Sequence, residues 1–207
     1  HLEQGLSLEQ AVEAVQAGLD AAVAAAEASG KNIQVGQLIT AMRHKDRGME
    51  IAELALKYRD KGAVGFDIAG AEAGFPASKF ADAFTHLANH MFPITVHAGE
   101  ADGVESIRSA LVDGRTLRLG HGVRIAEDIA ALDAGDADVA GLGDVARWVL
   151  ERGIPLELSP SSNLQTGAVA QWGTKMAQHP FDALYRLGFA VTVNTDNRLM
   201  SDISLSQ

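Results

Sequence analysis

The feature that most constrains the fold is a repeated alternation of short apolar runs and helical patterns. Six apolar runs, each ended by turn or polar residues, occupy residues 33–42, 63–68, 94–97, 117–119, 155–158 and 190–194. Helical patterns lie between them, at residues 49–58, 79–89, 104–111, 144–151 and 181–187. A strand followed by a helix, repeated along a chain, indicates βα units and therefore a parallel sheet.

The residues that end the six runs have the spacing of βα repeats. They are separated by 27, 27, 24, 38 and 37 residues, and they are Arg43, Gly70, His97, His121, Ser159 and Asp196. In a (β/α)8 TIM-type barrel, chemistry takes place at the carboxyl ends of several strands, which is where these polar residues stand. A doubly wound sheet is the alternative, but no Gly-rich phosphate fingerprint follows any of the runs. We therefore expect a barrel.

The length of the chain limits how much of a barrel it forms. A complete one needs about 250 residues, and here 207 residues supply six runs. We expect residues 1–207 to be one partial barrel domain with about six of eight strands, cut off at its N-terminus and shortly after the last strand. Before the first run, a capping-box pattern at Ser7 and Gln10 predicts the start of an Ala-rich helix that ends near Gly30.

Composition excludes several classes of protein. The chain has 17 basic and 27 acidic residues, a formal charge of −10, which disfavours nucleic acid and anionic membranes as partners. No apolar run approaches the ~20 residues of a membrane span. The absence of cysteine rules out disulfides, thiolate nucleophiles and cysteine-bound zinc. Residues 1–4 do not resemble a signal peptide, so the cytoplasm is the expected compartment.

Two histidines follow neighbouring runs. His97 stands three residues before Glu100, which places an imidazole and a carboxyl on one loop, as a metal ligand and a general acid or base would require. His121 lies between Gly120 and Gly122, which permit a close approach of the backbone. Each segment taken alone is more often an ordinary solvated turn.

Asp196 follows the last run. A carboxylate at a strand end can bind a metal or accept a proton from water, although it can equally cap a helix. Taken together, two histidines and an aspartate at three strand ends, with Glu100 beside the first, meet the requirements of a mononuclear hydrolytic zinc site. The combination predicts a metal-dependent hydrolase.

Six segments, in this order, resemble the adenosine deaminase family of the amidohydrolase superfamily. They are residues 42–44 (MRH), 67–70 (DIAG), 95–100 (TVHAGE), 118–122 (RLGHG), 156–163 (LELSPSSN) and 194–196 (NTD). The resemblance runs through essentially the whole chain, from the third strand of the family's barrel to its eighth. The combination is specific to the family, although no single motif is.

The resemblance implies zinc-dependent conversion of adenosine or 2'-deoxyadenosine to inosine or 2'-deoxyinosine and ammonia. His97 and Asp196 match zinc ligands of the family, and Asp196 is also expected among the catalytic residues. Glu100 matches the acid that shares a proton with purine N1, and His121 matches the histidine that orients the attacking hydroxide. Gly70 matches the glycine whose backbone faces purine N3. The expected partner is a small purine nucleoside.

Two departures from the family pattern leave the substrate open. The family's first strand carries a His-x-His pair that supplies two zinc ligands, and this sequence has no such pair. Asn197 stands where many members have a second aspartate that contacts purine N7; an asparagine amide can donate to N7. The alternatives are a deaminase of another 6-aminopurine, such as adenine or aminodeoxyfutalosine, or a catalytically inactive fragment or binding module. The sequence does not indicate an oligomeric state.

Overall fold

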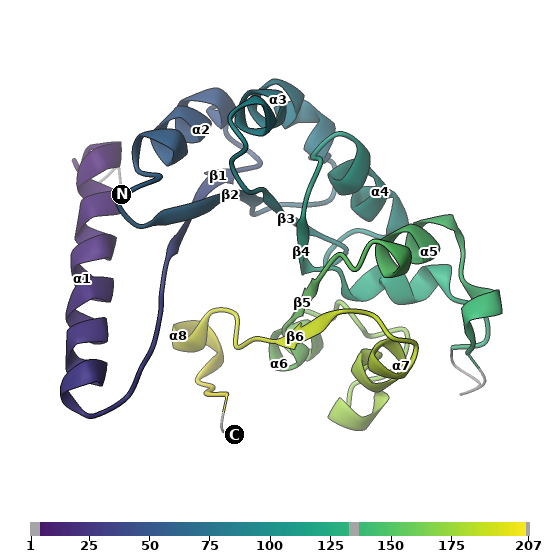
Figure 1. Cartoon of the computed structure of the whole chain (residues 1–207). Helices are drawn as coiled ribbons and strands as arrows, with labels where there is room; N and C mark the ends of the chain where they lie inside the picture. Colours follow the sequence, from purple (N-terminus) through teal and green to yellow (C-terminus); the bar gives the residue numbers. More distant parts are fainter. Residues whose placement is uncertain (1–4, 133–136, 206–207) are drawn as a thin grey trace.

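The computed structural model describes residues 5–132 and 137–205 (Figure 1). Residues 1–4 and 206–207, on which the expectations about the chain ends partly rest, lie outside this part. The strands are β1 (Gln37–Met42), β2 (Ala63–Ala69), β3 (Thr95–Ala98), β4 (Arg118–His121), β5 (Leu156–Leu158) and β6 (Val191–Val193). The α-helices are α1 (Leu8–Ala28), α2 (Gly48–Lys57), α3 (Ala81–Asn89), α4 (Val104–Val112), α5 (Asp144–Glu151), α6 (Pro160–Gln165), α7 (Phe181–Arg186) and α8 (Arg198–Ser201). Short 3-10 helices are η2 (Ala77–Phe80), η3 (Val123–Asp128), η4 (Val139–Gly141) and η5 (Met176–Gln178).

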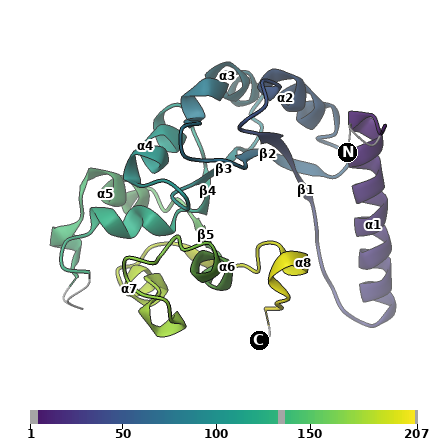
Figure 2. The same cartoon turned by 180° about the vertical axis from the view of Figure 1, so that it is seen from behind.

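The six strands are all parallel and follow chain order. β1 pairs with β2, and β3, β4, β5 and β6 form a second sheet in that order. A single bridge between Phe66 and Ile94 joins the two sheets. Helices α2 to α5 lie along the outer side of the curved row of strands (Figures 1 and 2). The predicted βα repeats and parallel strands are confirmed, and within the described residues β1 and β6 remain unpaired edges.

Burial alternates along β1 because helices cover only one of its faces. Ile39 and Ala41 are buried, whereas Leu38 and Met42, on the other face, are 40% and 43% exposed. β2 is buried through Phe66, Asp67 and Ile68. The core therefore lies between the strands and the outer helices, and apolar side chains of β1 remain exposed on the inner side of the curve.

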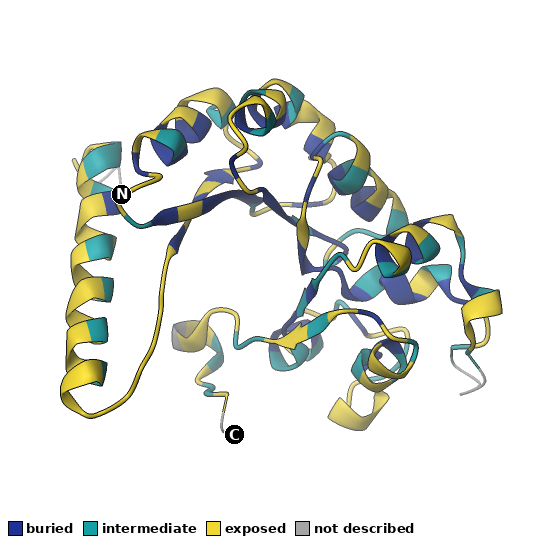
Figure 3. Ribbon diagram, viewed as in Figure 1, coloured by how far each residue is buried: buried dark blue, intermediate teal, exposed yellow. Residues whose placement is uncertain are grey.

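Helix α1 begins as the sequence predicts. The Ser7 hydroxyl accepts the Gln10 N–H, and the Gln10 side chain accepts the Ser7 N–H, which forms the expected capping box. Val12 is its buried residue, and most of the helix is exposed (Figure 3). Among the described residues, no helix is both long enough and apolar enough to span a membrane.

The first strand is shorter than the sequence predicts. It was expected over residues 33–42 but begins at Gln37. Its partner explains the difference, because β2 starts at Ala63, which pairs with Gln37, and residues 33–36 have no strand beside them.

Candidate catalytic site and metal centre

The candidate catalytic side chains lie at the carboxyl ends of three strands. His97 belongs to β3, His121 ends β4, and Asp196 lies three residues after β6. Ala98 pairs with His121, so Glu100 leaves β3 at the same edge. Parallel strands bring their carboxyl ends to one edge, and residues distant in sequence therefore meet there.

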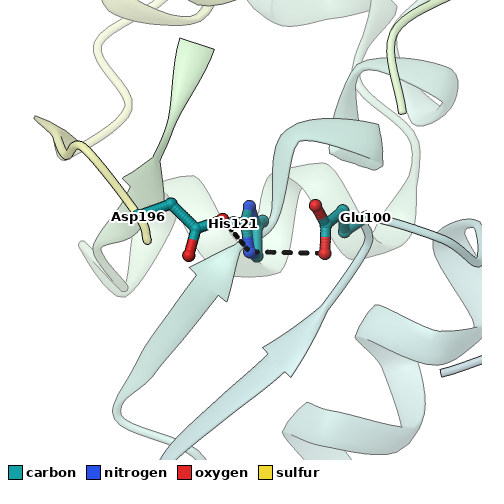
Figure 4. Close-up of side chains that lie close together, drawn as sticks. All are labelled: Glu100, His121 and Asp196. Carbon is teal, nitrogen blue, oxygen red and sulfur yellow. Dashed lines mark ion pairs between the residues drawn. The ribbon is translucent and has the colours of Figure 1, made fainter. Parts of the chain in front are cut away.

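Glu100, His121 and Asp196 form a close cluster (Figure 4). The His121 Nε2 atom lies 3.4 Å from Glu100 Oε2 and 3.9 Å from Asp196 Oδ2. One ligand atom from each of the three lies within 4.8 Å of the others, a spacing that could hold a metal ion. The structure thus brings three of the expected site residues together, and their chemical roles remain predictions.

His97 is oriented by a buried carboxylate on the neighbouring strand. Its Nδ1 atom lies 2.6 Å from Asp67 Oδ2, and its backbone N–H donates to Asp67 Oδ1 at 3.2 Å. Burial lowers the pKa of His97, but the contact with Asp67 and the negative charges of Asp67, Glu100 and Asp196 outweigh it and raise the pKa. In the neutral ring the Nδ1 proton faces Asp67, so the lone pair on Nε2 is available to a metal.

His121 sits between two closely packed glycines, as the sequence suggests. A Cβ at Gly120 would lie 2.9 Å from His97 Nδ1, and one at Gly122 would lie 2.8 Å from Leu156 Cδ2. Gly120 therefore lets β4 approach β3 closely, and Gly122 leaves room for Leu156 of β5. The ring centroids of His97 and His121 lie 5.3 Å apart. His121 has a left-handed backbone, with φ of 60°. Burial lowers its pKa.

Asp196 is held in place from α6, the helix that follows β5. Ser162 Oγ donates to Asp196 Oδ2 at 2.7 Å. Asp196 also has a left-handed backbone, with φ of 57°. The next residue, Asn197, caps α8, because its Oδ1 accepts the Met200 N–H at 3.2 Å.

The loop that carries Glu100 is organised around Glu72. This buried carboxylate accepts the backbone N–H groups of residues 99, 100, 101 and 102, at 2.5, 3.1, 2.7 and 3.1 Å. It also accepts the Ser106 hydroxyl at 2.5 Å. A carboxylate with this many donors holds its loop firmly, because each bond to a charged group is stronger than a neutral one. Thr166 Oγ1 donates to Glu100 Oε1 at 3.2 Å, which leaves Oε2 facing His121.

Arg43, which directly follows β1, ties the end of β3 to the segment after β2. Its buried guanidinium donates to the backbone carbonyls of Phe75 and His97. Burial lowers the pKa of Arg43, and the nearby carboxylates Glu72 and Asp67 oppose that shift. One buried anion, Glu72, therefore holds the loop between β3 and α4, and one buried cation, Arg43, holds the strand from which that loop leaves.

The two expected substrate-binding residues both follow strands of the parallel row. Gly70 directly follows β2 with φ of 94°, and a Cβ there would lie 2.9 Å from Met42 Cε. Asn197 adjoins Asp196. A cavity of about 460 Å³ lies beside the loop after β1 and is lined in part by Arg43 and His44, but Glu100, His121 and Asp196 do not line it. The cluster at the strand ends is therefore separate from this cavity.

Sequence reasoning missed the residues that support the site. Asp67 and Asn163 fell inside recognised segments but received no role, and Glu72 and His179 received none because no pattern marks them. All four are buried, with relative exposures from 0% to 6%. The supporting role of a buried acid or histidine can be predicted from sequence only when its hydrogen-bond partner is known.

Comparison with known proteins identifies the family that the chain resembles. A family model described as "Adenosine deaminase" matches residues 1–207. A curated adenosine deaminase from Mycobacteroides abscessus is 52% identical over 207 residues, which cover 100% of this chain and 55% of the relative. The chain therefore spans about half the length of the curated relatives it matches.

Two solved structures share the fold. Adenine deaminase from Arthrobacter aurescens matches with a TM-score of 0.75 and 26% identity, over 95% of this chain and 54% of that one. An amidohydrolase from Burkholderia ambifaria, solved with bound zinc, matches with a TM-score of 0.66 and 21% identity, over 87% of this chain and 46% of that one. The second likeness shows the fold alone. The α/β architecture of this chain thus corresponds to about half of a deaminase barrel.

Proposed function

This chain belongs to the adenosine deaminase family, and we propose that the protein containing it converts adenosine and 2'-deoxyadenosine to inosine and 2'-deoxyinosine. One water is consumed and one ammonia released per substrate. The meeting of His97, Glu100, His121 and Asp196 at one edge of the parallel strands carries the proposal. The 52% identity to a curated adenosine deaminase favours a nucleoside over other 6-aminopurines.

The residues present fit half of a zinc site. The contact of Asp67 with His97 Nδ1 leaves Nε2 for a metal, and Asp196, 3.9 Å from Nε2 of the neighbouring His121, offers a carboxylate at the same strand ends. A catalytic zinc needs about three protein ligands and a water, and the family resemblance assigns two further histidines to a strand outside this chain. Bound zinc would lower the pKa of a coordinated water to ~7.

The remaining chemistry falls to side chains of this chain. Purine C6 is a weak electrophile, and attack by water pushes ring electrons onto N1. The attack therefore requires an acid that protonates N1. Glu100 is that donor in our proposal, with Oε2 turned into the site. His121, whose Nε2 lies 3.9 Å from Asp196 Oδ2, orients the attacking water. The amino group then leaves the tetrahedral C6 as ammonia.

Gly70 and Asn197 are the proposed contacts to the purine. The Gly70 backbone would face N3. Because Asn197 Oδ1 already accepts the Met200 N–H, its amide nitrogen remains to donate to N7. The net charge of −10 is consistent with a small-molecule partner and disfavours nucleic acid and anionic membranes. We place residues 1–207 in one catalytic domain and the protein in the cytoplasm.

Substrate profiling tests this function. The sample is the full-length protein, meaning one that also carries the segments of the relatives that this chain does not cover. Adenosine, 2'-deoxyadenosine, adenine and aminodeoxyfutalosine are compared by kcat/KM at saturating zinc. We expect the two nucleosides to lead. A higher kcat/KM for adenine or aminodeoxyfutalosine would make that purine the substrate in place of adenosine. Zinc binding without turnover of any of the four purines would favour a binding module.

The N7 contact can be tested with a substrate that lacks N7. The full-length protein should prefer adenosine over 7-deazaadenosine by about fivefold in kcat/KM, since one hydrogen bond contributes about 1 kcal/mol. In Asn197→Ala the ratio of kcat/KM for adenosine to kcat/KM for 7-deazaadenosine should fall towards one. The ratio of two substrates cancels any loss of the α8 cap in the variant. An unchanged preference would remove Asn197 from purine recognition.

The Glu72 network predicts a stability effect. In the full-length protein, Glu72→Ala leaves the N–H groups of residues 99–102, of which that of Gly99 is buried, without their acceptor. The free energy of unfolding should fall by about 3 kcal/mol, at the upper end for a buried group left unpaired. Urea denaturation measures the loss, and hydrogen exchange should speed up at those amides. Glu105→Ala is the control, because the Glu105 side chain is 82% exposed in the following helix. Equal stability of the two variants would contradict the role of Glu72.

A further inference from the structure

His179 is a buried histidine in the loop before α7, and the proposed chemistry does not use it. Its Nδ1 atom accepts the backbone N–H of Phe181 at 3.0 Å. A backbone N–H can only donate, so Nδ1 carries no proton. Burial lowers the pKa of His179 to about 4, so the ring is neutral near pH 7. Its single proton therefore resides on Nε2.

The Nε2 proton of His179 determines the orientation of a buried amide. Nε2 lies 3.3 Å from Oδ1 of Asn163, which is fully buried at 0% exposure. An N–H needs an acceptor, so the amide oxygen of Asn163 must face His179. The amide nitrogen then faces the opposite direction.

That nitrogen faces His121. Asn163 Nδ2 lies 3.0 Å from His121 Nδ1. An amide nitrogen only donates, so His121 Nδ1 must supply the lone pair, and the proton of the neutral ring resides on Nε2. A doubly protonated His121 would set two donors against each other at this contact. The Nε2–H group points towards Glu100 and Asp196, at 3.4 and 3.9 Å.

We propose that His179 is a positioning residue: through Asn163 it fixes His121 in the tautomer with the proton on Nε2. The inference rests on the proposed function for its catalytic meaning. It assigns the two adjacent histidines opposite forms. His97, with Nδ1 against Asp67, presents a lone pair at Nε2 and can bind a metal. His121 presents a proton at Nε2, so it donates to the oxygen of the attacking water and is not a metal ligand, although its spacing from Glu100 and Asp196 would allow one.

The tautomer can be measured without relying on activity. Full-length protein labelled with 15N-histidine gives long-range 1H–15N spectra that distinguish protonated from unprotonated ring nitrogens. We expect His121 to show a protonated Nε2 and an unprotonated Nδ1 in the wild-type protein, with and without zinc. A protonated Nδ1 on His121 would overturn the proposal, and this reading requires no variant to fold.

Variants then test the dependence on His179. In His179→Leu, Asn163 loses the donor that orients it, so His121 should populate both tautomers and kcat should fall about tenfold, with KM nearly unchanged. His179→Gln retains an N–H donor for Asn163 and should restore most of the single tautomer and of kcat. His90→Leu, at an exposed histidine that ends α3, is the control. An unchanged His121 spectrum in His179→Leu would refute the relay. A fixed tautomer in a protein that does not deaminate adenosine would instead refute the proposed function alone.

Discussion

Replacing Glu100 with glutamine in the full-length protein is expected to lower kcat for adenosine by ~10²-fold or more, the usual scale for loss of a general acid. Glutamine has the shape of the acid, but its amide N–H cannot transfer a proton to N1 as water attacks C6. The contacts that hold the residue, from Glu72 to the backbone N–H and from Thr166 to Oε1, remain possible in the variant. Steady-state kinetics and zinc analysis of the same sample measure the two effects separately.

The zinc content distinguishes the role of Glu100 from that of Asp196. Glu100→Gln should retain zinc, because Glu100 is not a ligand in the proposed site. Asp196→Ala should lose zinc together with activity, because it removes a ligand. Ser162→Ala is a matched control, since it deletes only the hydroxyl that donates to Asp196 and should retain most of the metal. Equal loss of zinc from Glu100→Gln and Asp196→Ala would contradict separate roles.

The 207-residue chain by itself is expected not to deaminate adenosine. Only His97 and Asp196 serve as direct zinc ligands in the proposal, fewer than the three or so that a catalytic zinc needs. Zinc would bind weakly, and without it the attacking water has no means of ionising near neutral pH. An assay for inosine on the purified chain, with zinc present and measured, tests this.

The exposed strand edges predict that the purified 207-residue chain aggregates or unfolds at a low temperature. Among the described residues β1 and β6 each have one unpaired edge, and Leu38, Met42, Val64 and Val193 are 40% to 55% exposed. Unpaired strand edges with apolar side chains tend to associate with other chains. We expect aggregation or a low melting temperature, measured by light scattering and a thermal melt. Efficient turnover with one zinc per monomeric chain would refute this prediction, and His44 would then be the first residue to examine as a further ligand.

The sequence predicted the arrangement of strands because the relevant information is local. Apolar runs with regular spacing indicated the parallel strands, and strand ends indicated where His97, His121 and Asp196 would meet. The start of β1 was missed because it depends on where β2 begins, which is a property of the partner strand. The capping box at Ser7 was predictable because both partners lie within four residues.

The supporting residues depend on contacts across the fold. Glu72 binds a loop 27 to 30 residues further along the chain, and Asn163 reaches His121 over 42 residues. Nothing near either residue in the sequence distinguishes it from an exposed polar side chain. Their roles follow only from burial and hydrogen-bond partners.

The left-handed backbones of His121 and Asp196 have a consequence for how the site responds to mutation. Residues other than glycine in this conformation cost on the order of 1–3 kcal/mol each, least for asparagine and aspartate, and glycine avoids most of this cost. Selection for thermal stability alone should therefore favour glycine at both positions, most strongly at His121, whereas selection for turnover should retain histidine and aspartate. A stability screen and an activity screen of one library would then rank substitutions at these two positions in opposite orders.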